Sequence, residues 1–523
     1  MRREPGGATL APAERRSRRV LRLWPKAGAV RAFLLGLLAA LSLPPLFVLP
    51  VLWLVVPALL RLYAGAGGWR RTVWLAWCFG FGFNLAGLFW VTEPILIMAR
   101  DFWWAVPFAA PGLAAATAFY MIIPALAVHR MRPGLAMLFV FAGAWVMANL
   151  AQQFLFTGFP WNYWGADWAL PGRVGTVMTQ PAAWGGIHFL TLLTVFVAGL
   201  PLLGRRGWLA AGGVLAVWAG LGLWRVTRPS PGLRTLTIAM VQPDFPVPGS
   251  FTQVALRKRW HEDLAMTGKA LAEAGPGPKA VVWPETASPA LLQRNGQARA
   301  AIAGIAGKAP VLAGSFRYTK SGRLRNSLIA VDGAGPPAAI YDKWKLVPFG
   351  EYVPAWIPVK ILPGQSFTPG PGPQTLHVKG IPPVGPMICY ESIFTGEIVD
   401  RRDRPAWLLN ISDNAWFGDT TGPYQDFATT RLRAVEEGLP LAIDTNSGIS
   451  AMIGPRGQVR ARLGLDRRGI LLARLPVALP ATPYAKFGLT IPGVLSLYSV
   501  LAGLVLVILG SAAPGVASQK MSQ

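Results

Sequence analysis

Residues 386–391 read Pro-Met-Ile-Cys-Tyr-Glu, a short apolar run that delivers a cysteine and is followed by a carboxylate. The strand it belongs to is expected over 384–389, and similar runs surround it from residue 233 onward. Further strands are expected at 236–241, 280–283, 310–314, 327–331, 407–412 and 441–444, and helices at 251–274, 297–307 and 424–437. Strands that alternate with helices in this way predict a single α/β domain. We place it at 229–486.

The remainder of the chain is strongly apolar. Of 523 residues, 53% are hydrophobic, and the mean hydropathy of +0.40 is far above that of soluble domains. Apolar runs of roughly 18 or more residues indicate membrane spans. Such runs lie at 27–44, 46–62, 73–95, 104–128, 135–154, 174–203, 208–224 and 489–510. We therefore expect an α-helical membrane bundle of about eight transmembrane helices, although the first two runs also fit one re-entrant pair.

These runs divide the chain into four parts. A basic leader occupies 1–26, seven spans occupy 27–228, and the α/β domain is followed by a last span with a short tail at 487–523. Lys and Arg favour cytoplasmic loops, and the leader is rich in Arg. Alternation then places the loops at 61–71, 129–132 and 205–206, which carry cations, inside as well. The loops at 92–102 and 158–172 carry few cations, and the second is rich in tryptophan, so both fall outside. Both termini are thus expected in the cytoplasm and the α/β domain on the periplasmic side.

One alternative for the first span is a cleaved signal peptide. Removing that span would invert the agreement between cations and alternation, so we favour the spanning interpretation.

The composition also excludes several functions. The net charge of +26 suggests nucleic-acid binding as one hypothesis. Much of this charge lies beside apolar segments rather than in one patch, so we expect no nucleic-acid partner. Only Cys78 and Cys389 occur, which excludes a disulfide framework. The four histidines have no ligand spacing and no Gly-Lys-Ser/Thr phosphate loop is present. We expect no metal and no cofactor.

Three motifs carry chemistry within the α/β segment. A strand at 281–284 ends before Glu285, a loop at 341–354 holds Lys343 and Glu351, and the strand at 384–389 delivers Cys389. Taken alone, a glutamate after a strand is most often a solvated cap, a lysine in a loop is most often a surface charge, and a cysteine after a strand is most often a small buried apolar residue. Together, a carboxylate, an ammonium and a thiol at strand ends are what thiol-mediated acyl transfer requires. The thiol needs a base, and the tetrahedral intermediate needs a positive group or N–H donors.

In this order, the three motifs resemble the nitrilase superfamily, which has a Glu, Lys and Cys triad on an αββα sandwich. Together with seven preceding spans and one following span, the chain is similar to the apolipoprotein N-acyltransferase family of the bacterial inner membrane. The resemblance implies Glu285 as general base, Lys343 as stabiliser of the tetrahedral intermediate and Cys389 as nucleophile. Lys343 is preferred to Lys345 because it stands eight residues before Glu351, as in the family motif.

The resemblance also implies supporting roles for Glu351, Tyr390 and Glu391 around the thiol. One departure occurs, because the family usually reads Ser-Asn-Asp-Ala-Trp where this chain has Ser-Asp-Asn-Ala-Trp at 412–416. The roles of Asp413 and Asn414 are left open by it.

The implied reaction has two steps. Cys389 takes an acyl chain from a membrane phospholipid as a thioester, and the α-amino group of a diacylglyceryl cysteine at a lipoprotein N-terminus then accepts it. The expected partners are this phospholipid and the diacylglyceryl apolipoprotein, and the chain is expected to be a monomer. Apolar stretches at 344–346 and 355–362 are candidates for mobile arms that reach the headgroup region.

Two alternatives stay open. The first is a membrane-anchored amidase of the nitrilase type, in which water replaces the amine and a small amide is hydrolysed. The second is a transporter or scaffold with a catalytically inactive outer domain, for which we would expect the loss of one triad position.

Overall fold

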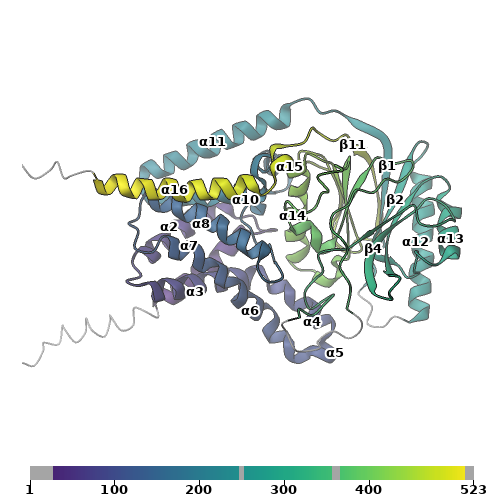
Figure 1. Cartoon of the computed structure of the whole chain (residues 1–523), viewed down its shortest axis with the longest axis horizontal. Coiled ribbons are helices and arrows are strands. Elements are labelled where there is room, and N and C mark those ends of the chain that lie inside the picture. Colours follow the sequence, from purple (N-terminus) through teal and green to yellow (C-terminus); the bar gives the residue numbers. More distant parts are fainter. Residues whose placement is uncertain (1–26, 247–251, 356–365, 513–523) are drawn as a thin grey trace, which may run out of the picture.

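The computed structural model describes residues 27–246, 252–355 and 366–512. The expected leader at 1–26, the segment 356–362 of the second candidate arm and the tail beyond 512 lie outside the described residues. A helical part and an α/β part lie end to end along the long axis (Figure 1).

The helical part contains every apolar run expected from the sequence. Its helices cover Ala27–Ser42, then α2 (Leu52–Ala64), α3 (Trp69–Gly87), α4 (Thr92–Ile97), α5 (Ala99–Phe102), α6 (Val106–Thr117), α7 (Ile122–Ala127), α8 (Leu135–Phe154), α9 (Gly172–Met178), α10 (Ala182–Gly199), α11 (Arg205–Thr227), α15 (Pro483–Phe487) and α16 (Thr490–Ala512). Within the described residues, five helices are long and apolar enough to cross a membrane, or six if the pair Trp69–Gly87 and Phe89–Ile97, bent by 63°, counts as one.

Two expected spans differ in detail from the observed helices. The run at 73–95 bends where α3 ends, so that α4 turns away from the axis of α3. The run at 174–203 is divided between α9 and α10, with Pro181 at the N-terminal cap of α10. Because proline lacks the N–H that a continuous helix requires, it favours a break at such a position.

The last helix, α16, returns to the bundle and packs along α8. Glycines on both helices permit this close approach. A Cβ at Gly143 of α8 would lie 2.4 Å from the carbonyl oxygen of Ser496, and one at Gly503 of α16 would lie 2.6 Å from that of Ala136. Small residues at such crossings are typical of helices that associate in lipid.

The α/β part is built from two sheets. Within the described residues, the six-stranded sheet has the order β11-β1-β2-β3-β4-β5 and the five-stranded sheet the order β10-β9-β8-β7-β6. The strands are β1 (Leu233–Gln242), β2 (Lys279–Ser288), β3 (Val311–Tyr318), β4 (Leu324–Val331), β5 (Ala339–Asp342), β6 (Val384–Ile388), β7 (Trp407–Ser412), β8 (Leu441–Thr445), β9 (Ser450–Ile453), β10 (Val459–Leu463) and β11 (Gly469–Pro476). The first three strands of each sheet in chain order are parallel.

Alternating side chains explain why the two sheets stack. Ile238 and Met240 of β1 face the core between the sheets, whereas Ala239 and Val241 face α12 (Gln253–Glu273) and α13 (Gly296–Ala306). The outer face of the second sheet packs against α14 (Gly422–Glu437). Because successive residues of a strand point to opposite faces, one apolar sequence supplies both layers. This is the expected αββα sandwich, with helices outside two sheets (Figure 1).

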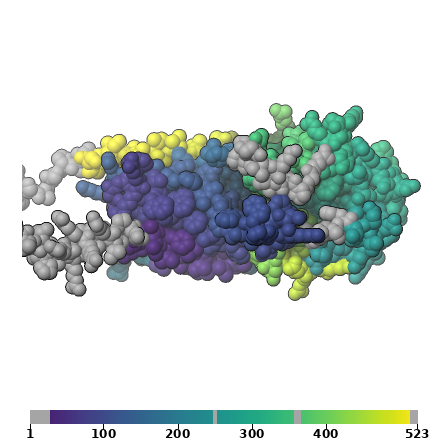
Figure 2. Space-filling view, turned by 90° about the horizontal axis from the view of Figure 1, so that it is seen from below, coloured from purple at the N-terminus to yellow at the C-terminus, as the bar shows by residue number. Residues whose placement is uncertain are grey.

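The helical part is tied to the α/β part by buried polar contacts. Gln153 Nε2 donates to the carbonyl oxygen of Thr395 at 2.9 Å, and the backbone N–H of Ile187 donates to Glu436 Oε1 at 2.8 Å. The space-filling view from below shows the segment of α4 and α5 lying over the junction of the two parts (Figure 2). The two parts therefore share one interface, and the strand ends described next lie near it.

Candidate active site

The three residues expected at the site stand at strand ends. Glu285 lies near the end of β2, Lys343 directly follows β5, and Cys389 directly follows β6. Since β2 and β5 run in the same direction in one sheet, their carboxyl ends share an edge, where ligands bind in many α/β folds. Cys389 has a φ of +51°, a left-handed conformation that costs about 1–3 kcal/mol in a non-glycine residue and is frequent at functional sites.

Lys343 lies between two carboxylates. Its Nζ is 3.1 Å from Glu285 Oε1 and 3.0 Å from Glu351 Oε1, and the side chain is 1% exposed. Burial lowers the pKa of Lys343, but the charges of Glu285 and Glu351 more than offset this, and the pKa stands well above its ordinary value. An ammonium has three N–H donors, and the two carboxylates use two of them. The group is therefore a fixed cation with one donor to spare.

Glu285 is held by three donors. Its Oε1 accepts from Lys343 and from Asn326 Nδ2 at 2.7 Å, and its Oε2 accepts from the backbone N–H of Asp413 at 2.9 Å. A carboxylate oxygen has two acceptor positions, so Oε2 keeps one for a further proton. The side chain is 6% exposed, and its orientation is set from β4, the loop after β5 and the loop after β7.

The Cys389 thiol lies within the field of these charges. Burial and the carboxylate of Glu285 raise its pKa well above the ordinary value, while Lys343 and the Ser412 hydroxyl lower it. Lys343 thus favours the thiolate, but burial and Glu285 outweigh it, so the raised pKa favours the neutral thiol. A neutral thiol needs a base before it can attack a carbonyl carbon.

Glu351 links the lysine to its own loop. Its Oε2 accepts the backbone N–H of Val347 at 2.8 Å, and its Oε1 also accepts from Asn326 Nδ2 at 3.2 Å. Asn326 thus donates to both carboxylates that flank Lys343. The two carboxylates, the lysine and the asparagine form one hydrogen-bonded cluster of four side chains. Asn326 lies near the start of β4 and belongs to no motif, so the sequence alone does not indicate its role.

Glu391 organises the backbone on the other side of the thiol. Its carboxylate accepts from the backbone N–H groups of Trp344 and Ile388, both at 2.7 Å, and from the Tyr341 hydroxyl at 2.9 Å. Burial raises its pKa to about 7. Glu391 therefore joins the loop that carries the lysine to the strand that carries the cysteine.

This arrangement also corrects one expectation for the stretch 344–346. Besides the bond from Trp344 to Glu391, Lys345 pairs with Glu397 at 2.9 Å, and Leu346 is 8% exposed. The stretch is packed into the site and does not project as an arm.

Tyr390 connects the turn that carries Cys389 with the helical part. Its hydroxyl donates to the carbonyl oxygen of Gly158 at 2.8 Å, and its ring packs in a cluster of mostly aromatic side chains from both parts. That cluster contains Leu88, Trp90, Trp161, Tyr390, Ile393 and Phe394. Gln425 of α14 accepts the indole N–H groups of Trp90 at 3.1 Å and Trp161 at 2.8 Å. The tryptophan-rich loop noted in the sequence therefore forms one apolar wall beside the thiol.

The two residues at the departure from the family pattern have different partners. The side chain of Asp413 accepts from Asn446 Nδ2 at 2.9 Å, and Asn414 Nδ2 donates to Asp426 at 3.2 Å. Burial raises the pKa of both Asp413 and Asp426 to about 6. Asp413 reaches Glu285 through its backbone N–H, a contact that does not depend on its side-chain type. Among the described residues, no group of three or more His, Cys, Asp or Glu side chains is arranged to hold a metal ion.

Two stacked sheets with a carboxylate, an ammonium and a thiol at their strand ends define a carbon-nitrogen hydrolase domain, and residues 237–482 match the family described as Carbon-nitrogen hydrolase. Residues 35–200 match the Apolipoprotein N-acyltransferase N-terminal domain. The apolipoprotein N-acyltransferase of Rhodopseudomonas palustris is 33% identical, with 90% of this chain and 93% of the relative covered. The apolipoprotein N-acyltransferase of Allorhizobium ampelinum is 35% identical, and the alignment covers 87% of this chain and 91% of the relative. The chain therefore belongs to the apolipoprotein N-acyltransferase family, as the sequence motifs indicate.

Nit3 of Saccharomyces cerevisiae, a member of branch 10 of the nitrilase superfamily, aligns with 19% identity and a TM-score of 0.36, covering 47% of this chain and 91% of Nit3.

Proposed function

We propose that the chain transfers a fatty acyl group from a membrane phospholipid, through a thioester on Cys389, to the α-amino group of an S-diacylglyceryl cysteine at a lipoprotein N-terminus. The observation that carries this proposal is the cluster of Glu285, Lys343 and Cys389. Glu285 and Lys343 stand at strand ends of one sheet and Cys389 at a strand end of the sheet stacked on it, and the helical part contributes to an apolar wall beside the Cys389 turn. Membership of the apolipoprotein N-acyltransferase family supports the choice of donor and acceptor.

The first half-reaction forms the thioester. As Cys389 Sγ attacks the ester carbonyl carbon, Glu285 Oε2 takes the thiol proton, which the raised thiol pKa makes necessary. The third N–H of Lys343 is available for the developing oxyanion. The ester C–O bond then breaks, and the departing lysophospholipid oxygen takes the proton from Glu285.

The second half-reaction consumes the thioester. The α-amino nitrogen of the diacylglyceryl cysteine attacks the thioester carbon, Glu285 takes a proton from that nitrogen, and the C–S bond breaks. Sγ leaves as a thiolate and receives the proton from Glu285. Water would compete for the same carbon. The aromatic cluster and its apolar neighbours favour the amine acceptor, because they limit the access of water to the thioester.

The proposed placement has eight spans, with both termini in the cytoplasm and the α/β domain on the periplasmic side of the inner membrane. The loops that carry cations support it. Helix α11 begins at Arg205 and Arg206 and ends where β1 starts, so these arginines lie at the end away from the α/β part. Thr72 Oγ1 lies 3.0 Å from His129 Nδ1 and joins two further cationic loops. The proposal also includes three domains, at 27–228, 229–486 and 487–523, and a monomeric protein.

A transfer assay tests the proposed function. Full-length protein in detergent is given a phospholipid labelled in its acyl chains, first without and then with a diacylglyceryl cysteine peptide. We expect an acyl adduct on Cys389 by mass spectrometry in the first case and labelled peptide in the second, and neither with Cys389→Ser. Release of free fatty acid without peptide acylation would favour the hydrolytic amidase instead. No adduct on Cys389 would contradict the thioester.

A further inference from the structure

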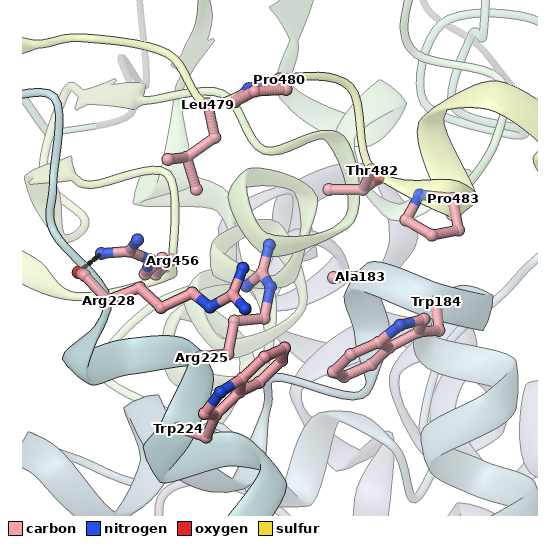
Figure 3. A pocket seen from close by; sticks show the side chains of 10 residues that line it. All are labelled: Ala183, Trp184, Trp224, Arg225, Arg228, Arg456, Leu479, Pro480, Thr482 and Pro483. Atoms are coloured by element: carbon pink, nitrogen blue, oxygen red, sulfur yellow. Dashed lines mark hydrogen bonds between the residues drawn. The ribbon is translucent and has the colours of Figure 1, made fainter.

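A pocket lies on the α/β side of the helical part. It encloses a volume of about 240 Å³, and its most characteristic lining residues are Trp184, Trp224, Arg225, Arg228, Arg456 and Pro483. They come from the start of α10, the end of α11, the loop after β9 and the start of α15 (Figure 3). None of these elements carries Glu285, Lys343 or Cys389. The pocket is therefore separate from the acyl-transfer site.

Three guanidinium groups meet there without a counter-charge. Within the described residues, none of Arg225, Arg228 and Arg456 forms an ion pair with a carboxylate, and neither Asp nor Glu lines the pocket. Like charges gathered in a partly buried place repel one another unless an anion joins them. The composition of the pocket thus selects a negatively charged ligand.

The contacts of Arg456 and Arg225 fix the cluster. Arg456 is 7% exposed, and it donates to the carbonyl oxygens of Arg228 at 2.9 Å and Pro229 at 3.0 Å. Its Nε is buried and has no hydrogen-bond partner among the described residues. Burial and the charge of Arg228 lower the pKa of Arg456. Arg225 donates to Gln180 Oε1. Arg225 and Arg456 are thus held in place by hydrogen bonds, and the buried Nε–H of Arg456 is left as a donor without a partner among the described residues.

Arg228 is exposed, but its guanidinium is held in place by stacking on the ring of Trp224. The distance from Arg228 Cζ to the ring centroid is 3.8 Å. Trp224 is 50% exposed at the end of α11, a helix apolar enough to cross a membrane. Tryptophans at the end of a span favour the level of the lipid headgroups. The arginines thus lie where a headgroup phosphate would be found.

The size of the pocket fits a headgroup rather than a whole lipid. Pockets for drug-sized ligands enclose about 300–1,000 Å³, and this one is smaller. Directly below it, α11 exposes apolar side chains, among them Leu221 at 51% and Val217 at 64%, along which acyl chains could lie. We propose that the pocket binds the phosphate of an anionic glycerophospholipid, with its acyl chains along α11, as a second lipid site apart from the acyl-transfer centre.

The absence of a carboxylate from the lining gives this site a preference. A headgroup ammonium, as in phosphatidylethanolamine, would find no acidic partner there and would be repelled by the arginines. Phosphatidylglycerol brings the same phosphate without the ammonium, and guanidinium groups match phosphate oxygens in a fork geometry. The expected order is therefore phosphatidylglycerol before phosphatidylethanolamine.

The test measures lipid binding directly. Full-length protein with Cys389→Ser, which prevents turnover of the lipid, is titrated in a non-ionic detergent with short-chain phosphatidylglycerol, phosphatidylethanolamine of the same chains, or inorganic phosphate, and bound lipid is counted by native mass spectrometry. We expect Arg225→Gln with Arg228→Gln to weaken phosphatidylglycerol binding by about fivefold per guanidinium lost. Phosphatidylethanolamine binding should not change, and inorganic phosphate should not compete.

Two further variants make the result decisive. Arg206→Gln removes the same charge at the opposite end of α11 and should leave phosphatidylglycerol affinity as it is. Arg228→Gln alone changes an exposed side chain. It should lower the affinity for phosphatidylglycerol by about fivefold, and it tests the proposal even if the double variant does not fold. Equal phosphatidylglycerol affinity in Arg228→Gln and the parent protein would overturn the proposal. So would an equal loss for phosphatidylethanolamine, or displacement of lipid by inorganic phosphate, which would indicate a free-anion site.

Discussion

The Tyr390 hydroxyl donates a 2.8 Å hydrogen bond to the carbonyl oxygen of Gly158, so that the residue after Cys389 is fixed to a loop of the helical part. Both groups are buried. The position of the Cys389 turn therefore depends on the bundle as well as on the sheets. This contact gives a physical reason for the presence of both parts in one chain.

Tyr390→Phe should lower acyl transfer by about tenfold while the protein stays folded. The ring packing is kept, but one hydrogen bond worth about 1 kcal/mol is lost, and the Gly158 carbonyl is left without its partner at a cost of about 1–3 kcal/mol. Transfer rate and thermal unfolding are the measurements. Tyr498→Phe, at a 68% exposed position on α16, should match the wild type in both. An unchanged rate for Tyr390→Phe would show that the contact does not position the thiol.

Glu285→Gln should separate catalysis from thiol ionisation. Loss of the proposed general base should reduce the transfer rate by about 10²- to 10⁴-fold. The Glu285 charge raises the Cys389 pKa, whereas Lys343 lowers it, so removing the carboxylate should shift that pKa downward. A lower pKa means more thiolate at a given pH below it, and alkylation of Cys389 by iodoacetamide should therefore reach its half-maximal rate at lower pH than in the wild type.

The measurement is the pH profile of alkylation in a Cys78→Ala background. Glu351→Gln is the matched control, because it also removes one carboxylate partner of Lys343 but is not among the main causes of the Cys389 shift. Its profile should stay close to that of the wild type. A profile of Glu285→Gln displaced to higher pH would refute the electrostatic account.

Sequence predicted most of the α/β part because its strands are apolar runs that length and flanking turns distinguish from helices. The strands expected at 407–412 and 441–444 coincide with β7 and β8 within one residue. The strands β5, β9, β10 and β11 were missed. All of these but β9 lie at sheet edges, and β10 reads Val-Arg-Ala-Arg-Leu with exposed arginines. Such an edge strand has too little apolar character to be found without its partner strand.

The site was predicted where a residue's type already limits its chemistry. Glu285, Lys343 and Cys389 could be predicted as candidates because a carboxylate, an ammonium and a thiol at strand ends are informative together. Asn326 was not found, since its role comes from β4 lying beside β5 and from two carboxylates that are distant in sequence. The backbone N–H of Asp413 could not be found for the same reason, because every non-proline residue has that donor.

Asn326→Leu and Asn326→Asp should form a series. Leucine removes the donor shared by Glu285 and Glu351, and hydrogen bonds to charged groups are worth about 1.5–3 kcal/mol, so transfer should fall by about 10- to 100-fold. Aspartate adds a third carboxylate beside one lysine, and like-charge repulsion should make its loss larger. Steady-state transfer rates check the order. If Asn326→Asp were as active as Asn326→Leu or more so, the cluster would not depend on charge balance.

Gly314→Ala should displace Glu285, the proposed general base. A Cβ at Gly314 of β3 would lie 2.2 Å from the carbonyl oxygen of Pro284 and 2.7 Å from the Cα of Glu285, and neither is the end of a flexible side chain. The backbone that carries Glu285 must therefore move, and a shift of about 1 Å can cost about 100-fold in rate. Gly304→Ala is the matched control, since no atom lies within 4 Å of a Cβ there and alanine stabilises a helix interior by about 0.5–1 kcal/mol. The control should retain full transfer activity with an equal or higher melting temperature. Full activity in Gly314→Ala would mean that β2 and β3 separate without moving Glu285, and the base would then be positioned by Asn326, Lys343 and the Asp413 N–H alone.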